Sequence, residues 1–155
     1  MTTFMIKSSA FPDGTSLPIE FTCDGADQSP PLEWSEPPRE TKSFALIVDD
    51  PDAPSGTFSH WAAFNIPSAA RDLAAGAGNS SEGMMSQARN DFGKSGYGGA
   101  CPPEGHGRHR YRFKLFALNV DQLDVPSDAK VKDVEARAAQ HLIARAELTG
   151  TYERK

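Results

Sequence analysis

Apolar and polar residues alternate along several short stretches of the chain, a pattern typical of half-buried β-strands. The first such stretch covers residues 17–23, where every second residue is apolar or cysteine. It is preceded by the turn pair Asp13-Gly14. We therefore expect a strand over residues 17–23, with residues 4–6 as its hairpin partner.

Four later stretches also predict strands. Residues 44–48 are apolar throughout, as expected of a central strand covered on both faces. Residues 60–67 and 109–118 are also predicted to be strands, and Pro67 should end the first of these two. Residues 147–152 form the last predicted strand.

One segment has the period of an amphipathic helix. It runs from about residue 129 to residue 143, with Ser127 or Asp128 as its N-cap. One apolar stripe is formed by Val131, Val134, Ala138 and Leu142. With one helix among several strands, the fold class is mostly β with minor α.

Residues 76–107 lack apolar periodicity and are rich in glycine and proline. Irregular segments of this length in a compact domain are usually functional or mobile. The stretch GYGGACPPEGHGRHRY at 96–111 combines stiff prolines with flexible glycines. That combination indicates an ordered backbone shaped around a ligand.

Length and composition limit the function. The 155 residues fit a single domain over 1–155, and the formal charge of −5 argues against binding of nucleic acid or anionic membranes. No signal-like leader or membrane-spanning stretch is present, so we expect a soluble cytoplasmic protein without stable membrane insertion. In a reducing cytosol, Cys23 and Cys101 are expected to be free thiols.

Polar residues lie at the ends of the predicted strands. Asp50 and Asp52 follow one strand, His60 opens the next, and His109 and Tyr111 open a third. Residues two apart in a strand share a face, so the His109 and Tyr111 side chains should point the same way. Only the fold can bring these three groups together.

The other polar residues have simpler interpretations. Arg110, Arg112 and Lys114 alternate on the opposite face of the same strand and are expected to form a solvated sheet surface. His106 lies between glycines and should be solvated. His141 lies beside the helix stripe and should be structural.

Several separate motifs together resemble one family. The motifs are FTCDGADQSPPLEW at 21–34, DPDAP at 50–54, HWAAFNIP at 60–67 and GYGGACPPEGHGRHRY at 96–111. They resemble the phosphatidylethanolamine-binding proteins, also called Raf kinase inhibitor proteins, in their short bacterial and archaeal branch. The resemblance covers nearly the whole chain. It implies a large antiparallel sheet packed on a smaller one, a C-terminal helix and a small anion-binding pocket at a rim of strand ends.

The resemblance also implies the pocket residues. Gly99 and Gly105 would shape its wall, while Ala100 stands where proline is common and Arg108 where small or apolar residues are common. These two departures bear on the rigidity and ligand preference of the pocket. The ligand-binding residues implied by the motifs are Asp50, Asp52, His60, His109, Tyr111, Pro102, Pro103 and Gly99.

These residue types suit phosphate or a phosphoethanolamine-like ligand. Asp50 or Asp52 can accept from an ammonium group, while a protonated histidine and the Tyr111 hydroxyl can donate to phosphate. Because histidine ordinarily titrates near pH ~6.5, we expect affinity to fall as pH rises past that region. The Asp-Pro-Asp sequence is also an ordinary turn, and the two interpretations are compatible.

We therefore expect a non-enzymatic binding protein without metal or cofactor. The resemblance implies inhibition of a kinase or protease by docking, and homodimers. Two alternatives stay open. A metal-dependent hydrolase would use His60, His106, His109 and Asp52, and a cysteine hydrolase would use Cys101 with His109.

Overall fold

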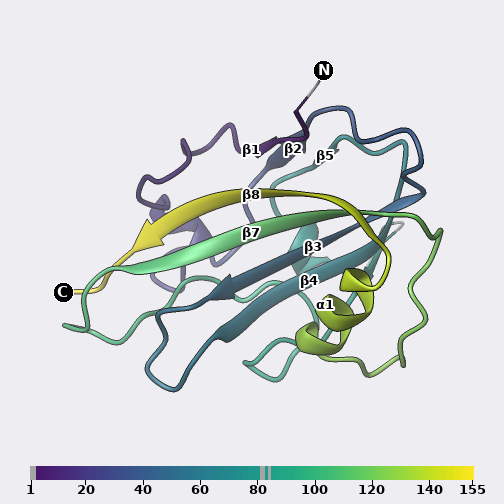
Figure 1. Ribbon diagram of the computed structural model, residues 1–155. Coiled ribbons are helices and arrows are strands. Elements are labelled where there is room, and N and C mark those ends of the chain that lie inside the picture. The colour runs from purple at the N-terminus through teal and green to yellow at the C-terminus, as the bar shows by residue number, and fades with distance from the viewer. Residues whose placement is uncertain (1–2, 81–82, 84) are drawn as a thin grey trace.

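The computed structural model describes the chain except residues 1, 2, 81, 82 and 84, and it contains two antiparallel sheets and one α-helix (Figure 1). The larger sheet has the strand order β6-β4-β3-β7-β8, and the smaller has the order β1-β2-β5. Within the described residues, no helix has the length and apolarity needed to cross a membrane. The predicted fold class, a large antiparallel sheet with a smaller one and a late helix, is confirmed.

The bounds of the elements are as follows. The large sheet consists of β3 (Ser43–Asp50), β4 (Phe58–Pro67), β6 (Ser86–Gln87), β7 (His109–Leu118) and β8 (Leu142–Tyr152). The small sheet consists of β1 (Ile6–Lys7), β2 (Leu32–Trp34) and β5 (Asp72–Leu73). The helices are α1 (Val131–Ala139) and two 3₁₀ turns, η1 (Ile19–Phe21) and η2 (Ala77–Asn79).

Strand β3 is the buried centre of the large sheet. All eight of its residues are buried, and it pairs with β4 on one side and β7 on the other. The apolar stretch over 44–48 therefore lies where its composition predicts. Strand β4 begins two residues before the predicted start and ends at Pro67 as expected, and β7 has the predicted bounds.

The alternation along β7 sorts its side chains between two apolar layers. Tyr111, Phe113 and Leu115 belong to the core between the two sheets. Phe116 and Leu118 belong to a second core, which lies beneath α1. His109 and Tyr111 therefore point away from the helix side, as their two-residue spacing predicts.

The strand predicted over residues 17–23 is wrong. Residues Ile19–Phe21 form η1, where the Thr22 hydroxyl and backbone N–H both donate to the carbonyl of Ile19. Pro18 precedes this turn with a φ of −57°, a value suited to entering a helical turn. The true partner of β1 is β2, with Ile6 opposite Trp34.

The helix is shorter than the pattern predicts. It begins at Val131 rather than after Ser127 or Asp128, because the Asp133 carboxylate accepts from the backbone N–H of Lys130 and caps the first turn there. Leu142 opens β8 instead of extending the apolar stripe, and it is 42% exposed.

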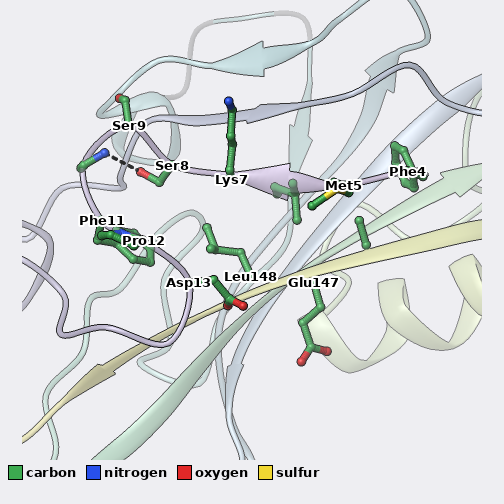
Figure 2. A pocket seen from close by; sticks show the side chains of 13 residues that line it. Phe4, Met5, Lys7, Ser8, Ser9, Phe11, Pro12, Asp13, Glu147 and Leu148 are labelled. Carbon is green, nitrogen blue, oxygen red and sulfur yellow. Dashed lines mark hydrogen bonds between the residues drawn. The ribbon is translucent and has the colours of Figure 1, made fainter. Parts of the chain in front are cut away.

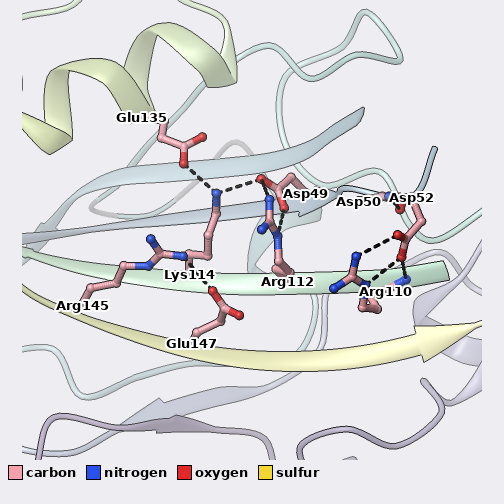
Figure 3. A network of polar contacts seen from close by, with 9 residues as sticks. All are labelled: Asp49, Asp50, Asp52, Arg110, Arg112, Lys114, Glu135, Arg145 and Glu147. Carbon is pink, nitrogen blue, oxygen red and sulfur yellow. Dashed lines mark hydrogen bonds and ion pairs between the residues drawn. The ribbon is translucent and has the colours of Figure 1, made fainter. Parts of the chain in front are cut away.

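The cationic row on β7 is paired rather than simply solvated (Figure 3). Lys114 is only 4% exposed and donates to Asp49 at 2.8 Å and to Glu135 of α1 at 2.6 Å. Arg112 also binds Asp49, at 2.8 Å. The expected solvated surface is wrong for Lys114, because the helix and two carboxylates enclose its ammonium group.

The long segment over 76–107 is largely irregular, with η2 and β6 as its regular elements among the described residues. It is nonetheless held by specific bonds. The Tyr97 hydroxyl donates to the carbonyl of Phe21, and Gly99 N–H donates to the Asp27 carboxylate. These bonds fix the second half of the segment against the turn at η1.

Candidate functional site

A cavity of about 190 Å³ lies where β3 ends and where β4 and β7 begin. Six of the predicted ligand-binding residues line it, and Asp52 and Gly99 are outside its lining. The fold thus brings together the ends of three strands that are remote in the sequence. The lining residues are Asp50, Ala53, Pro54, Phe58, His60, Phe92, Cys101, Pro102, Pro103, His109 and Tyr111.

A chain of three polar side chains runs from the cavity to the surface. His109 Nδ1 lies 2.7 Å from Asp50 Oδ2, and His109 Nε2 lies 2.7 Å from His106 Nδ1. Since a carboxylate oxygen only accepts, Nδ1 of His109 carries the proton of the first bond. His106 is exposed, as predicted, but it is bonded to the site rather than merely solvated.

Asp50 also forms the turn that ends β3. Its Oδ1 atom accepts from the backbone N–H of Asp52 at 2.8 Å, which is an Asx turn. The same carboxylate therefore braces the chain reversal and orients His109. Asp50 thus takes part in the turn and also lines the cavity, so the two interpretations remain compatible.

Asp52 has a different role from the one its motif implies. Its carboxylate accepts from the backbone N–H and guanidinium of Arg110, with each contact at 2.9 Å (Figure 3). This bonding holds the pKa of Asp52 down at about 2. Asp52 therefore fastens the turn to β7 outside the cavity.

His60 is buried at 4% exposure, with its ring packed against the rings of Phe58, Phe92 and Tyr111. Its Nδ1 atom lies 2.7 Å from the carbonyl oxygen of Gly98 and must donate to it. Burial lowers the pKa of this imidazole, although neighbouring carboxylates and the Gly98 carbonyl oppose the shift. The expected charged imidazole near neutral pH is therefore wrong for His60, because desolvation outweighs the aspartates that favour the charged form.

Tyr111 is 2% exposed, and no hydrogen bond satisfies its hydroxyl among the described residues. Burial, followed by the negative charge of Asp50 and by the closeness of its carboxylate oxygen to the hydroxyl, raises the pKa of the phenol, so the group stays protonated. Buried hydroxyls rarely lack a partner. An O–H donor therefore lies buried in the wall of the cavity, beside the Asp50 carboxylate but without a hydrogen bond of good geometry.

A disulfide between Cys23 and Cys101 closes one side of the site. The expected free thiols are wrong because the fold brings residues 78 apart in sequence together beside a backbone bond from Cys23 N–H to the Ala100 carbonyl. Ala100 is buried at 2% exposure. Arg108, the second departure from the family pattern, is paired with Glu153 at 3.8 Å.

The two glycines expected to shape the wall act through the backbone. Gly99 is so close to Asp27 and to the carbonyl of Phe21 that a side chain there would require them to shift. Gly105 has a φ of +74°, a conformation that favours glycine. Its N–H donates to the carbonyl of Arg154, which ties the loop carrying His106 to the C-terminal segment.

The residues that the structure describes do not bring together the parts expected for either alternative enzyme. The metal ligand set of His60, His106, His109 and Asp52 does not gather, since Asp52 is bonded to Arg110. Among the described residues, no group of three or more His, Cys, Asp or Glu side chains is arranged to hold a metal. The nucleophile of the cysteine alternative, Cys101, is bound in the disulfide.

A second hollow, of about 480 Å³, lies between the N-terminal segment 4–13 and strand β8 (Figure 2). Its charged side chains include Lys7 and Glu147, which pair elsewhere with Glu33 and Arg145. Among the residues that line it, the titratable side chains of Lys7, Asp13 and Glu147 are all exposed. We therefore place the candidate site in the smaller cavity, where Asp50, His60 and His109 converge.

Comparison with known proteins identifies the family. The family model described as phosphatidylethanolamine-binding protein matches residues 7–153. The chain belongs to this family. A UPF0098 protein of Aquifex aeolicus is 49% identical over 150 residues, covering 96% of this chain and 88% of that protein. The predicted bacterial and archaeal branch is thereby confirmed.

Solved structures agree with the fold. The crystal structure of Escherichia coli YbcL, described as a new member of the mammalian PEBP family, matches with a TM-score of 0.92 and 38% identity, over 98% of this chain and 99% of that one. A carboxypeptidase Y inhibitor in complex with its proteinase matches with a TM-score of 0.54 and 18% identity, over 98% of this chain and 83% of that one. This second likeness shows the shared fold.

Sequence reasoning missed part of the phosphatidylethanolamine-binding protein site. Phe58 shares a strand face with His60, so its two-residue spacing was an available signal. Phe92 lies in the irregular segment, where no periodicity indicates which side chains turn inward. The bond between His106 and His109 depends on the path of the loop through Gly105 and Gly107, which the sequence pattern does not specify.

Proposed function

We propose that this protein binds a small phosphate-bearing ligand in the cavity at the strand ends and does not catalyse a reaction. One observation carries the proposal. The Tyr111 hydroxyl is buried in the cavity wall without a partner, and a buried unpaired polar group costs about 1–3 kcal/mol. A phosphate oxygen that accepts from this hydroxyl would remove that cost.

The size and the remaining polarity of the cavity support the same ligand class. A volume of about 190 Å³ suits a free phosphate or a headgroup. Asp50 supplies a carboxylate that can accept from an ammonium group, as in phosphoethanolamine. Family membership supports a phosphate-bearing ligand in general, since the matching family model is named for binding phosphatidylethanolamine.

Calorimetric titration with inorganic phosphate and phosphoethanolamine tests the proposal. We expect saturable binding at one site per chain. Tyr111→Phe removes the hydroxyl and keeps the ring, so it should weaken binding by roughly tenfold. Tyr97→Phe is the matched control, because the Tyr97 hydroxyl is bonded to Phe21 away from the cavity. Absence of binding by the folded parent would refute the function.

A regulatory role by docking to a kinase or protease forms the second part of the proposal. It is supported by family membership and by the structural neighbour that inhibits carboxypeptidase Y. A partner would meet the rim around Pro103, which is exposed beside the cavity. Crosslinking from a photoreactive residue at position 103, with and without phosphate, would show whether a kinase or protease contacts this rim.

Assembly and location complete the proposal. We retain the homodimer as an expectation, which light scattering after size exclusion would test. The disulfide between Cys23 and Cys101 favours an oxidising compartment rather than the cytoplasm that the sequence suggested. Alkylation of free thiols in intact cells distinguishes these locations, because only a cytoplasmic chain should label at both cysteines.

A further inference from the structure

The proton of the His60 ring is fixed on one nitrogen. Nδ1 lies 2.7 Å from the carbonyl oxygen of Gly98, and a carbonyl oxygen can only accept. In the neutral ring, Nε2 then has a lone pair and no hydrogen. Within the described part of the chain, no hydrogen bond engages Nε2, while the side chain lines the cavity. His60 therefore offers a ligand an acceptor.

The surroundings keep this ring neutral. Aromatic rings of Phe58, Phe92 and Tyr111 pack against it. The charged groups near it are Asp49, Asp50 and Asp91, which favour its protonated form. Their effect is smaller than that of burial, which lowers the pKa of His60. Near neutral pH the ring is thus an acceptor and not a cationic donor.

The other polar side chains of the cavity include more hydrogen-bond acceptors than is usual for an anion site. Asp50 is a second acceptor, and both nitrogens of His109 are already engaged, by Asp50 and His106. Tyr111 is the available donor. No lysine or arginine is among the lining residues. A fully ionised dianion would meet the Asp50 charge and would leave Nε2 of His60 without a hydrogen.

We propose that the site selects a phosphate group in its singly charged, protonated form, with the ligand O–H donating to His60 Nε2 and another ligand oxygen accepting from Tyr111. This inference rests on the proposed function and names the ligand more narrowly. Inorganic phosphate and phosphomonoesters carry such a proton around neutral pH, since their second pKa is about 6–7. Phosphodiesters and sulfate esters carry none. The ligand is therefore a free phosphate or monoester rather than an intact phospholipid headgroup.

A matched set of small ligands separates charge from protonation. Methyl phosphate in its protonated form, dimethyl phosphate and methyl sulfate are all monoanions, but only the first has an O–H. Calorimetry at pH 6 should show methyl phosphate binding roughly tenfold or more tightly than the other two. Equal affinities for the three ligands would overturn the selection and leave the proposed function standing. Failure of all three and of inorganic phosphate to bind would overturn both.

A substitution tests the residue. His60→Gln replaces the lone acceptor with an amide that can also donate, so the preference for methyl phosphate over methyl sulfate should shrink by at least severalfold. His141→Gln is the matched control, because His141 lies between α1 and β8 and is not among the residues that line the cavity, so this variant should keep the preference. A folded His60→Gln protein with undiminished preference would overturn the assignment.

The pH profile of the unmodified protein gives an independent test. Affinity for methyl phosphate should rise as the pH falls from 8 through the second ionisation of the ligand. Methylphosphonate has a higher second pKa than methyl phosphate, so its profile should be shifted to higher pH. Identical midpoints for the two ligands would place the titrating group in the protein and overturn the inference.

Discussion

His109 Nδ1 lies 2.7 Å from Asp50 Oδ2, with the two side chains at 2% and 5% exposure. The two residues end and begin neighbouring strands and are 59 positions apart in the sequence. Because the pair is enclosed, His109 Nδ1 and Asp50 Oδ2 have little access to water and satisfy each other, while Asp50 Oδ1 is bonded to Asp52 N–H and His109 Nε2 to His106. The same contact therefore orients the cavity and stabilises the fold.

His109→Ala should lower the free energy of unfolding by about 3 kcal/mol, because it leaves the Asp50 carboxylate buried with less compensation. Urea denaturation of the parent and variant measures the change. Adding Asp50→Asn to this variant should cost less than Asp50→Asn costs in the parent, since the charge that remained unpaired is removed. Strictly additive losses would contradict the coupling between the two residues.

His106 has a separate, testable effect on ligand affinity. It occupies His109 Nε2 from an exposed position between two glycines. His106→Ala should leave stability almost unchanged and free that nitrogen for the ligand. We expect phosphate affinity to rise roughly two- to tenfold, which corresponds to the net free energy of one hydrogen bond. Weaker binding by the folded variant would instead make His106 a ligand contact.

The strand pattern of the large sheet was predictable because burial acts directly on residue choice. Strands β3, β4 and β7 show apolar runs or two-residue alternation, and their bounds followed within two residues. Residues 17–23, which include η1, have the two-residue alternation of a strand. Pro18 and the Thr22 hydroxyl nevertheless favour a helical turn there. Periodicity alone cannot distinguish these local bonds from a strand.

The sequence predicted which residues line the candidate site better than it predicted their hydrogen bonds. Motif resemblance indicated Asp50, His60, His109 and Tyr111, all of which line the cavity. Which nitrogen of a histidine is engaged, and which carboxylate binds Arg110, depend on distances across the fold. The disulfide could not be predicted either, because pairing of Cys23 with Cys101 requires contact between segments far apart in the chain.

The disulfide should contribute substantially to stability. It closes a long loop, with a sequence separation of 78 residues. Reduction should lower the free energy of unfolding by about 2–4 kcal/mol, mainly by releasing the unfolded chain. Urea denaturation with and without a phosphine reductant measures the loss. The Cys23→Ser, Cys101→Ser double variant is the control and should not respond to the reductant, whereas an unchanged parent would contradict the prediction.

Ion pairs on the helix side of the sheet should differ in how much they stabilise the fold, depending on how deeply they are buried. Lys114 is enclosed between Asp49 and Glu135, and Lys114→Ala should cost about 2–3 kcal/mol of stability, because Arg112 still compensates the Asp49 charge. Arg145→Ala removes the exposed pair with Glu147 and should cost less than about 1 kcal/mol. Thermal and urea denaturation of the two variants provide the comparison. Equal losses would show that burial does not decide the outcome here.

Asp52 should contribute to the resistance of the fold to acid. Arg110 holds the pKa of this carboxyl at about 2 in the folded protein, below its ordinary value of 3.8. A lowered pKa in the folded state means that the charged pair stabilises the protein above pH ~4. That contribution is lost as the pH falls through about 2.

Asp52→Asn should therefore lower stability at pH 7 by less than about 1 kcal/mol, because Arg110 is largely exposed and solvent screens the pair. The difference from the parent should shrink from pH 4 downward and vanish near pH 2, as the parent carboxyl takes up its proton. Urea denaturation at a series of pH values measures both profiles. Arg110→Ala should flatten the same acid dependence, since it removes the cause of the lowered pKa. Parallel stability curves for parent and Asp52→Asn down to pH 2 would show that the pair does not couple protonation to folding.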